Sequence, residues 1–315
     1  PKEPEFSISE TVEPTLTGYE LSEGNLLVLD MAKYRINNGA WQDKKDVLII
    51  DRQIRDALHI DRRGGEKLQP WYIEKYIETP DKGMAEFIFE FGIEEMPKED
   101  IFLCMEEPKS FELEVNGNHV DTDTYEGEYI DIAFKRIRIR KELLLKGNNI
   151  IETKTKYNFK TNLEPMYLTG NFGVRTEKNY CVIINLPEKL EIGDITGQGL
   201  PFYGGRVRYF FDIPASSKLL VEVENIDAAL LVINPDKDNK AIISKPYIID
   251  TTGNDGKLVI DAVLTRRNTF GPYHIYPAKQ WGCQPQSFYT TGDAYKDEFV
   301  SMPMGLLSSP KVHIC

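Results

Sequence analysis

The sequence predicts an all-β fold built from two tandem β-sandwiches with few short helices. Three observations lead to this prediction. Short apolar runs recur along the chain, many with the alternation of a half-buried strand. Glycine and asparagine turns separate them. The order of strand motifs in the first half returns in the second half, as in a tandem repeat.

In the first half, the strand-like runs are short and β-branched or aromatic. The turns between them are Asn-Gly or Gly-Asn pairs, which favour tight hairpins. Two short segments, residues 51–59 and 69–77, are the only ones with a helical pattern. The expected strands are residues 26–30, 47–51, 85–93, 101–105, 111–117, 130–134, 137–140 and 149–157.

The second half repeats this series of short strands and turns, and the repeat defines the expected domains. An aromatic strand running to a proline opens both halves, and a Gly-Asn or Asp-Gly turn precedes the last strand of each. We expect residues 1–14 to be a linker, 15–175 the first sandwich and 176–315 the second, with residues 163–174 crossing between them. The expected strands are residues 207–214, 218–225, 228–236, 245–250 and 257–264.

Net charge excludes some partners. The chain carries a formal charge of -12, and such a field repels nucleic acid and anionic membrane surfaces. The most basic run, residues 135–141, alternates with isoleucine and is typical of a strand with one solvated face. No apolar stretch approaches the ~20 residues that span a bilayer. We therefore expect neither nucleic acid nor membrane as a partner.

Four widely spaced cysteines, Cys104, Cys181, Cys283 and Cys315, form no CxxC pair, so neither a zinc site nor a disulfide scaffold is indicated. Cys104 and Cys181 lie in apolar runs, where a buried free thiol is usual.

Two motifs of the first half, EVNGN (residues 114–118) and LLKGNNIIE (144–152), resemble the galactose-binding-like jelly roll of many glycoside hydrolases. With residues 26–42, 163–174, 197–209 and 266–274, the chain resembles the C-terminal sandwich region of large bacterial glycoside hydrolases of the α-L-rhamnosidase-like type. The resemblance implies two jelly rolls and a catalytic domain upstream in the same polypeptide as partner. Location in the bacterial cytoplasm or outside the cell depends on that upstream part.

No catalytic residue is assigned. Glu164 and Asp30 interrupt apolar segments, but a buried carboxylate that caps a turn or pairs with arginine is the commoner explanation. There is no GxSxG motif, and His59, His119 and His313 have no triad or HExxH context. The glycine-rich residues 197–205 lead into a strand instead of a helix, so they do not form a phosphate cradle.

The resemblance to galactose-binding-like sandwiches implies a structural calcium ion, held by loop oxygen ligands. Asp236, Asp238 and Asn239 are the first candidate, and Asp121 and Asp123 the second. A polar turn is the simpler explanation of these residues, and no cofactor is required.

Carbohydrate recognition would use aromatic faces beside groups that bond hydroxyls. The best collective candidate is the cluster between Phe270 and Trp281, although sandwiches also bury such aromatics in their cores. The candidate residues are Trp71, Tyr72, Tyr203, Arg267, Asn268, Tyr273, His274 and Trp281.

Three functions remain open. The first is a non-catalytic carbohydrate-associated region that supports a glycoside hydrolase domain and binds oligosaccharide. The second is a stand-alone glycoside hydrolase or polysaccharide lyase, whose activity a change such as Glu164→Gln would abolish. The third is a structural protein-interaction module, which predicts an exposed apolar face of several hundred Å².

Overall fold

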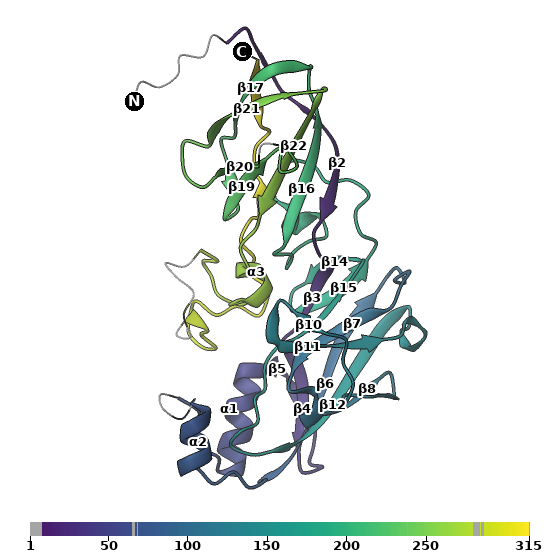
Figure 1. The fold of residues 1–315 in the computed structure, drawn as a ribbon. Coiled ribbons are helices and arrows are strands. Elements are labelled where there is room, and N and C mark those ends of the chain that lie inside the picture. The colour runs from purple at the N-terminus through teal and green to yellow at the C-terminus, as the bar shows by residue number, and fades with distance from the viewer. Residues whose placement is uncertain are drawn as a thin grey trace. The chain divides into compact units, whose positions relative to one another are not determined.

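The computed structural model describes residues 8–64, 67, 69–237, 239–279, 284 and 287–314. It confirms the all-β prediction: the described elements are mostly strands in several antiparallel sheets, with short helices between them (Figure 1). The chain divides into two compact units. We call Asn25–Asn185 with Tyr289–Phe299 the central sandwich, and Pro1–Gly24, Leu186–Phe288 and Val300–Cys315 the terminal sandwich.

Two sheets make up the central sandwich. A five-stranded sheet has the order β10 (Glu128–Tyr129), β11 (Asp131–Ile139), β7 (Ile101–Glu106), β13 (Met166–Gly170) and β3 (Asn25–Leu29). The eight-stranded sheet has the order β14 (Gly173–Glu177), β15 (Tyr180–Ile184), β6 (Gly83–Ile93), β12 (Gly147–Tyr157), β8 (Glu112–Val115) and β9 (Asn118–Val120). In the same sheet, β4 (Met31–Ile36) pairs with β6 and with β5 (Gln42–Asp46).

Alternation along the strands closes the core of the central sandwich. On β6, Phe87, Phe89 and Phe91 are at most 1% exposed. Glu86 and Glu90, which alternate with these phenylalanines along the strand, are partly exposed. On β12, the residues between the buried ones likewise face solvent. Successive side chains of a strand point to opposite faces, so the outer face of the eight-stranded sheet is polar.

The two motifs of the jelly-roll resemblance meet in the structure. Asn116 and Gly117 both have positive φ, 51° and 74°, in the tight turn between β8 and β9. The Asn116 amide nitrogen donates to Oδ1 of Asn149 at 2.9 Å. Asn149 also accepts from the Leu145 backbone nitrogen at 2.8 Å and donates to the Leu145 carbonyl at 2.7 Å. These bonds join the two motifs through side-chain amides.

One predicted strand is a helix. Residues 47–51 begin α1 (Val47–Leu58), because the Asp46 side chain caps the helix by accepting from the Leu48 backbone nitrogen at 2.7 Å. Val47, Ile50 and Ile54 are buried on one helical face, and α1 lies against β4 and β5 (Figure 1). The second expected helix is α2 (Pro70–Tyr76). Single-turn 3₁₀ helices span Pro108–Ser110 and Lys141–Leu143.

The terminal sandwich also has two main sheets. One has the order β1 (Glu10–Val12), β24 (Lys311–Ile314), β17 (Ser216–Glu222) and β21 (Ile248–Asn254). The other has the order β2 (Thr15–Leu21), β16 (Arg206–Asp212), β22 (Lys257–Val263), β19 (Leu230–Ile233) and β20 (Lys240–Ile242). The remaining elements are the pair β18 (Ile226–Asp227) and β23 (Gly305–Leu306), the 3₁₀ helix Ile195–Gln198, and α3 (Arg267–Phe270).

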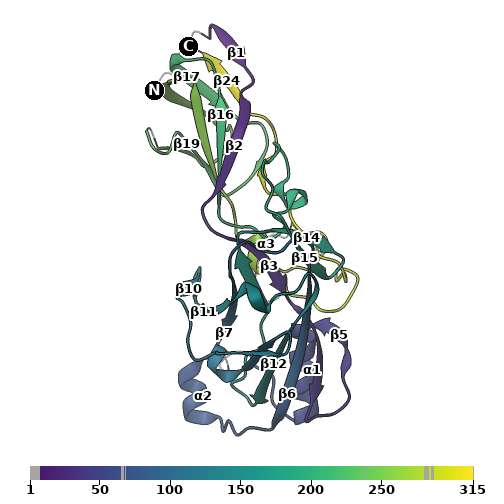
Figure 2. The same cartoon turned by 90° about the vertical axis from the view of Figure 1, so that its right-hand side faces the viewer.

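A single buried cluster draws on both sheets of the terminal sandwich. Leu219 and Val221 of β17 and Tyr209 and Phe211 of β16 belong to it. Residues 10–12 of the expected linker form β1, which pairs with β24 (Figure 2). The predicted domain ranges are contiguous, whereas each compact unit is assembled from separated segments. Residues 163–174, expected to cross between the sandwiches, lie in the central one.

Among the described residues, no helix is long and apolar enough to cross a membrane.

Candidate functional site

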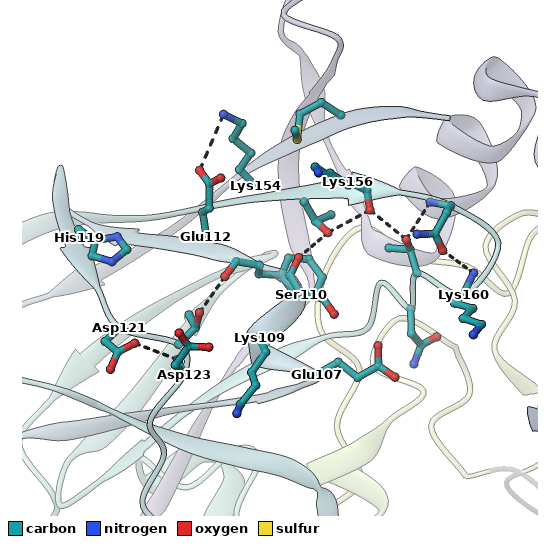
Figure 3. Close-up of a pocket in the computed structure, with 17 residues that line it drawn as sticks. Glu107, Lys109, Ser110, Glu112, His119, Asp121, Asp123, Lys154, Lys156 and Lys160 are labelled. Carbon is teal, nitrogen blue, oxygen red and sulfur yellow. Dashed lines mark hydrogen bonds and ion pairs between the residues drawn. The ribbon is translucent and has the colours of Figure 1, made fainter. Parts of the chain in front are cut away.

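A polar hollow of about 640 Å³ lies on the central sandwich (Figure 3). Its walls come from β8, β9 and β12 and from the loops at residues 107–111, 121–123 and 158–162. Four lysines, one histidine and four carboxylates line it, together with hydroxyl and amide groups. The charged lining residues are Lys109, Lys154, Lys156, Lys160, His119, Glu107, Glu112, Asp121 and Asp123.

The pairing of β12 with β8 positions the side chains in the middle of this hollow. Lys154 on β12 and Glu112 on β8 are directly opposite in the sheet, and their Nζ and Oε2 atoms are 3.8 Å apart. Between Lys154 and Lys156, the buried Thr155 hydroxyl donates to the Ser110 carbonyl at 2.7 Å. That bond ties the loop before β8 to β12, so two strands and a loop share one wall.

The ends of the hollow differ in charge. Asp121 accepts from the Asp123 backbone nitrogen at 2.9 Å and from the Thr124 hydroxyl at 2.6 Å. The Thr124 bond, followed by the Asp123 bond, holds the pKa of Asp121 below its usual value. Figure 3 shows Asp121 and Asp123 beside His119, away from Lys156 and Lys160. The hollow therefore has a carboxylate end and a lysine end.

Two cations in the hollow are available to a ligand. Within the described ranges, the ammonium groups of Lys109 and Lys160 form no ion pair or hydrogen bond with another side chain, and both residues are exposed. Ammonium groups only donate and carboxylates only accept, whereas a hydroxyl does both. The set is therefore suited to a ligand rich in hydroxyl groups.

The structure brings two predicted sugar-binding residues together outside the hollow. Trp71 and Tyr72 are neighbours on α2, with ring centroids 5.7 Å apart in an edge-on arrangement. Trp71 is 60% exposed. Tyr76, one turn after Tyr72, adds a third ring 4.9 Å from it, which the spacing i to i+4 could have revealed.

Other predicted sugar-binding residues are tied into the terminal sandwich. Tyr203 is 1% exposed, and its hydroxyl accepts from the Ser22 backbone nitrogen and donates to the Arg206 carbonyl. Arg267 donates to the carbonyls of Pro272 and Ala278 at 2.7 and 3.0 Å.

The remaining described sugar-binding candidates of the terminal sandwich are buried. Asn268 is 2% exposed and exchanges hydrogen bonds with the backbone of Met302. Tyr273 is 8% exposed and donates to the Thr269 carbonyl at 2.6 Å, and His274 is 3% exposed. Trp281 lies outside the described residues. Arg267 to His274 thus come together as an internally bonded segment that presents little ring surface.

The first calcium candidate is partly described. The Asp236 carboxylate pairs with Arg208 at 3.0 Å, and the Asn239 backbone nitrogen donates to the Asn234 carbonyl at 3.1 Å. Asp238 lies outside the described residues. The calcium site at this loop stays a prediction. The second candidate, Asp121 with Asp123, lines the hollow.

Glu164 lies in a partly buried polar cluster of the central sandwich. Burial, followed by the charges of Glu106 and Asp51, raises its pKa to about 7. The Asn162 amide donates to Glu106 at 2.8 Å and accepts from Arg63 at 2.7 Å. The adjoining cavity, about 10 Å³, is the size of one water molecule. Asp30, the other carboxylate noted in the sequence, is 2% exposed.

Sequence reasoning missed most of the hollow. It noted His119, Asp121 and Asp123, but none of the lysines or Glu107 and Glu112. Their signal is only that of polar positions alternating along β8 and β12, which a plain solvated face also gives.

No protein-family model and no curated protein matches the chain. Several solved structures with a similar arrangement are glycoside hydrolases. A β-D-mannosidase from Dictyoglomus thermophilum has 14% identity and a TM-score of 0.31, over 80% of this chain and 32% of that one. A glycosyl hydrolase family 2 member from Bacteroides cellulosilyticus has 10% identity and a TM-score of 0.28, over 77% and 32%.

A β-galacturonidase from Eisenbergiella tayi, bound to galacturonate, has 10% identity and a TM-score of 0.26, over 80% of this chain and 38% of that one. The chain thus spans about a third of the length of these enzymes. The likeness is one of fold, and at these scores it supports no argument about activity. The rhamnosidase-like resemblance stays a prediction.

Proposed function

We propose that this chain is a non-catalytic, carbohydrate-associated β-sandwich region of a glycoside hydrolase, and that it binds oligosaccharide in the polar hollow of the central sandwich. The observation that carries the proposal is the lining of that hollow, in which ammonium, carboxylate, hydroxyl and amide groups surround a space of about 640 Å³. The sequence resemblance to glycoside hydrolase sandwich regions supplies the biological setting.

The ligand chemistry follows from the side chains. Each hydroxyl of a neutral sugar can donate to a carboxylate and accept from an ammonium group. Hydrogen bonds with one charged partner are the stronger ones, at about 1.5–3 kcal/mol each. Asp121, Glu112, Lys109 and Lys160 offer such partners at different sides of the hollow. A neutral sugar also avoids repulsion by the net charge of -12.

Binding measurements on lysine variants test the proposal. Calorimetric titration of the chain with neutral gluco-, manno-, galacto- and xylo-oligosaccharides should give saturable binding to at least one series. Lys109→Ala and Lys160→Ala should each weaken it several-fold, because each removes a charged donor. Lys98→Ala, an exposed lysine of the same unit outside the hollow, should leave it unchanged. No binding to any series, or equal binding by all variants, contradicts the proposal.

The proposed partner is a catalytic domain upstream in the same polypeptide. The open reading frame that encodes this chain tests this directly. A glycoside hydrolase domain encoded before residue 1 supports the ancillary role, whereas a stop codon or an unrelated domain there removes it.

A second candidate, a stand-alone hydrolase or lyase, is favoured by Glu164. A carboxyl group whose pKa is near 7 can act as a general acid at neutral pH. Against it, the adjoining cavity of about 10 Å³ has room for one water molecule and not for a sugar. Turnover of aryl glycosides or polysaccharides by this chain, lost in Glu164→Gln, would support catalysis. Absence of turnover over such a panel removes it.

A further inference from the structure

A second, smaller hollow of about 210 Å³ adjoins the first on the outer face of the eight-stranded sheet. Glu112 and Lys154 line both, so the two hollows are contiguous. The second hollow adds an indole ring to the lining, that of Trp41, which is 39% exposed. Among the described residues, no exposed tryptophan, tyrosine or phenylalanine lines the first hollow.

Local structure holds this indole in place. Trp41 follows the turn between β4 and β5, where Asn37 and Asn38 have φ of 51° and 56°. The Asn37 side chain accepts from the Met84 backbone nitrogen at 2.8 Å, which fastens the turn to β6. The Arg35 guanidinium carbon lies 4.7 Å from the Trp41 ring centroid, and Glu86 binds Arg35 at 2.5 Å.

These contacts leave part of the ring open. The guanidinium group covers one face of the indole by a cation–π contact, so the exposed part of the ring is offered to the hollow. Because the ring is already oriented by Arg35 and the turn, little side-chain freedom is lost when a ligand stacks on it.

The second hollow is acidic, which limits the ligand. Glu86, Glu114 and Glu152 line it along with Glu112. Glu152 and Glu114 are directly opposite on β12 and β8, a pairing of like charges that weakens a sheet. A carboxylated sugar at this end would add further repulsion.

We propose that the two hollows form one groove for an extended oligosaccharide, in which Trp41 stacks on a sugar unit that bears no carboxylate. The groove crosses from β4 through β6, β12 and β8 to β9. Four inter-strand steps of about 4.8 Å make this roughly 19 Å. This inference rests on the proposed oligosaccharide binding. It adds the length of the groove and the end of the groove at which a carboxylated sugar unit is disfavoured.

A chain-length series tests the inference. The series that binds in calorimetry is titrated as di-, tetra- and hexasaccharide. The affinity of the wild-type chain should rise with length, and Trp41→Ala should weaken hexasaccharide binding about tenfold while changing disaccharide binding at the lysine end little. Trp71→Ala, an exposed tryptophan on α2, is the matched control and should bind the hexasaccharide as the wild type does.

The outcomes separate this inference from the proposed function. Disaccharide and hexasaccharide binding of equal strength, with Trp41→Ala unchanged, overturns the groove but leaves oligosaccharide binding intact. Hexasaccharide binding lost in Trp71→Ala and kept in Trp41→Ala overturns both. If a hexasaccharide with a uronic acid at every unit binds as tightly as the neutral one, the claim that the sugar unit at Trp41 bears no carboxylate is overturned.

Discussion

Glu164 makes a pH-dependent contribution to stability. Burial, followed by the charges of Glu106 and Asp51, opposes ionisation of its carboxyl group and raises its pKa to about 7. The groups around it come from α1, the following loop, β7 and residues 157–162. The groups that act on it are Asp51, Arg63, Glu106 and Asn162, and Asp51 in turn bonds to Arg55 and Tyr157.

The raised pKa of Glu164 sets the direction in which the free energy of unfolding changes with pH. An acid whose pKa is 4.5 when unfolded and about 7 when folded binds more protons in the fold between these values. The free energy of unfolding therefore falls as pH rises from about 4.5 to about 7, by about 3 kcal/mol at most from this group. Urea denaturation of Glu164→Gln should lack this decline, because the amide does not ionise. A decline identical to that of the wild type would contradict the assignment.

At the same scale, candidate residues were hard to predict because polarity does not reveal partners. Arg267 and Asn268 look like ligand groups in the sequence, yet backbone carbonyls bind both. Trp71 and Tyr72 were named because aromatic rings can stack on sugars, and their part in binding stays a prediction. Trp41 was not named, because the role we propose for it depends on Arg35 and Glu86, which lie on neighbouring strands.

Among the elements, the β8–β9 hairpin and the start of β12 depend on one buried amide. Asn149 is 0% exposed and bonds to Leu145, Gly147 and Asn116. Replacing it by alanine leaves buried backbone groups unpaired, at about 1–3 kcal/mol for each group. We expect Asn149→Ala to lower the free energy of unfolding by several kcal/mol.

Denaturant titration measures this loss. Asn118→Ala is the control, because Asn118 is exposed and bonds only to carbonyls of its own turn. It should change stability by well under 1 kcal/mol. Equal losses in the two variants would show that the amide bridge does not stabilise the hairpin.

Element type was largely predictable, since period-two alternation follows from strand geometry. The exception, residues 47–51, is a run of apolar residues too short for its period to decide between strand and helix. The Asp46 cap decided it. The pairing of strands was beyond the sequence, because contacts such as that of β4 with β6 join residues about fifty positions apart.

At the scale of the whole molecule, the chain has two separate compact units. The terminal sandwich has its own buried cluster, and its Asp261, 1% exposed, accepts from Arg208 at 2.7 Å and pairs with Arg206 at 3.1 Å. Losing one partner of a buried ion pair costs about 3–5 kcal/mol.

Calorimetry should therefore resolve two unfolding transitions. Asp261→Asn should lower the midpoint of one and Asn149→Ala that of the other, because each change lies in a different unit. A single transition that both variants lower equally would contradict independent cores.

The most direct measurement for the central claim is a crystal structure of the chain grown with the neutral hexasaccharide that binds most tightly. We predict sugar density over the outer face of β12, with a ring against Trp41 and hydroxyl groups within hydrogen-bonding distance of Glu112, Lys154 and Lys160. Density on the aromatic rings of α2 or on the terminal sandwich, with the hollow holding only water, would contradict the account.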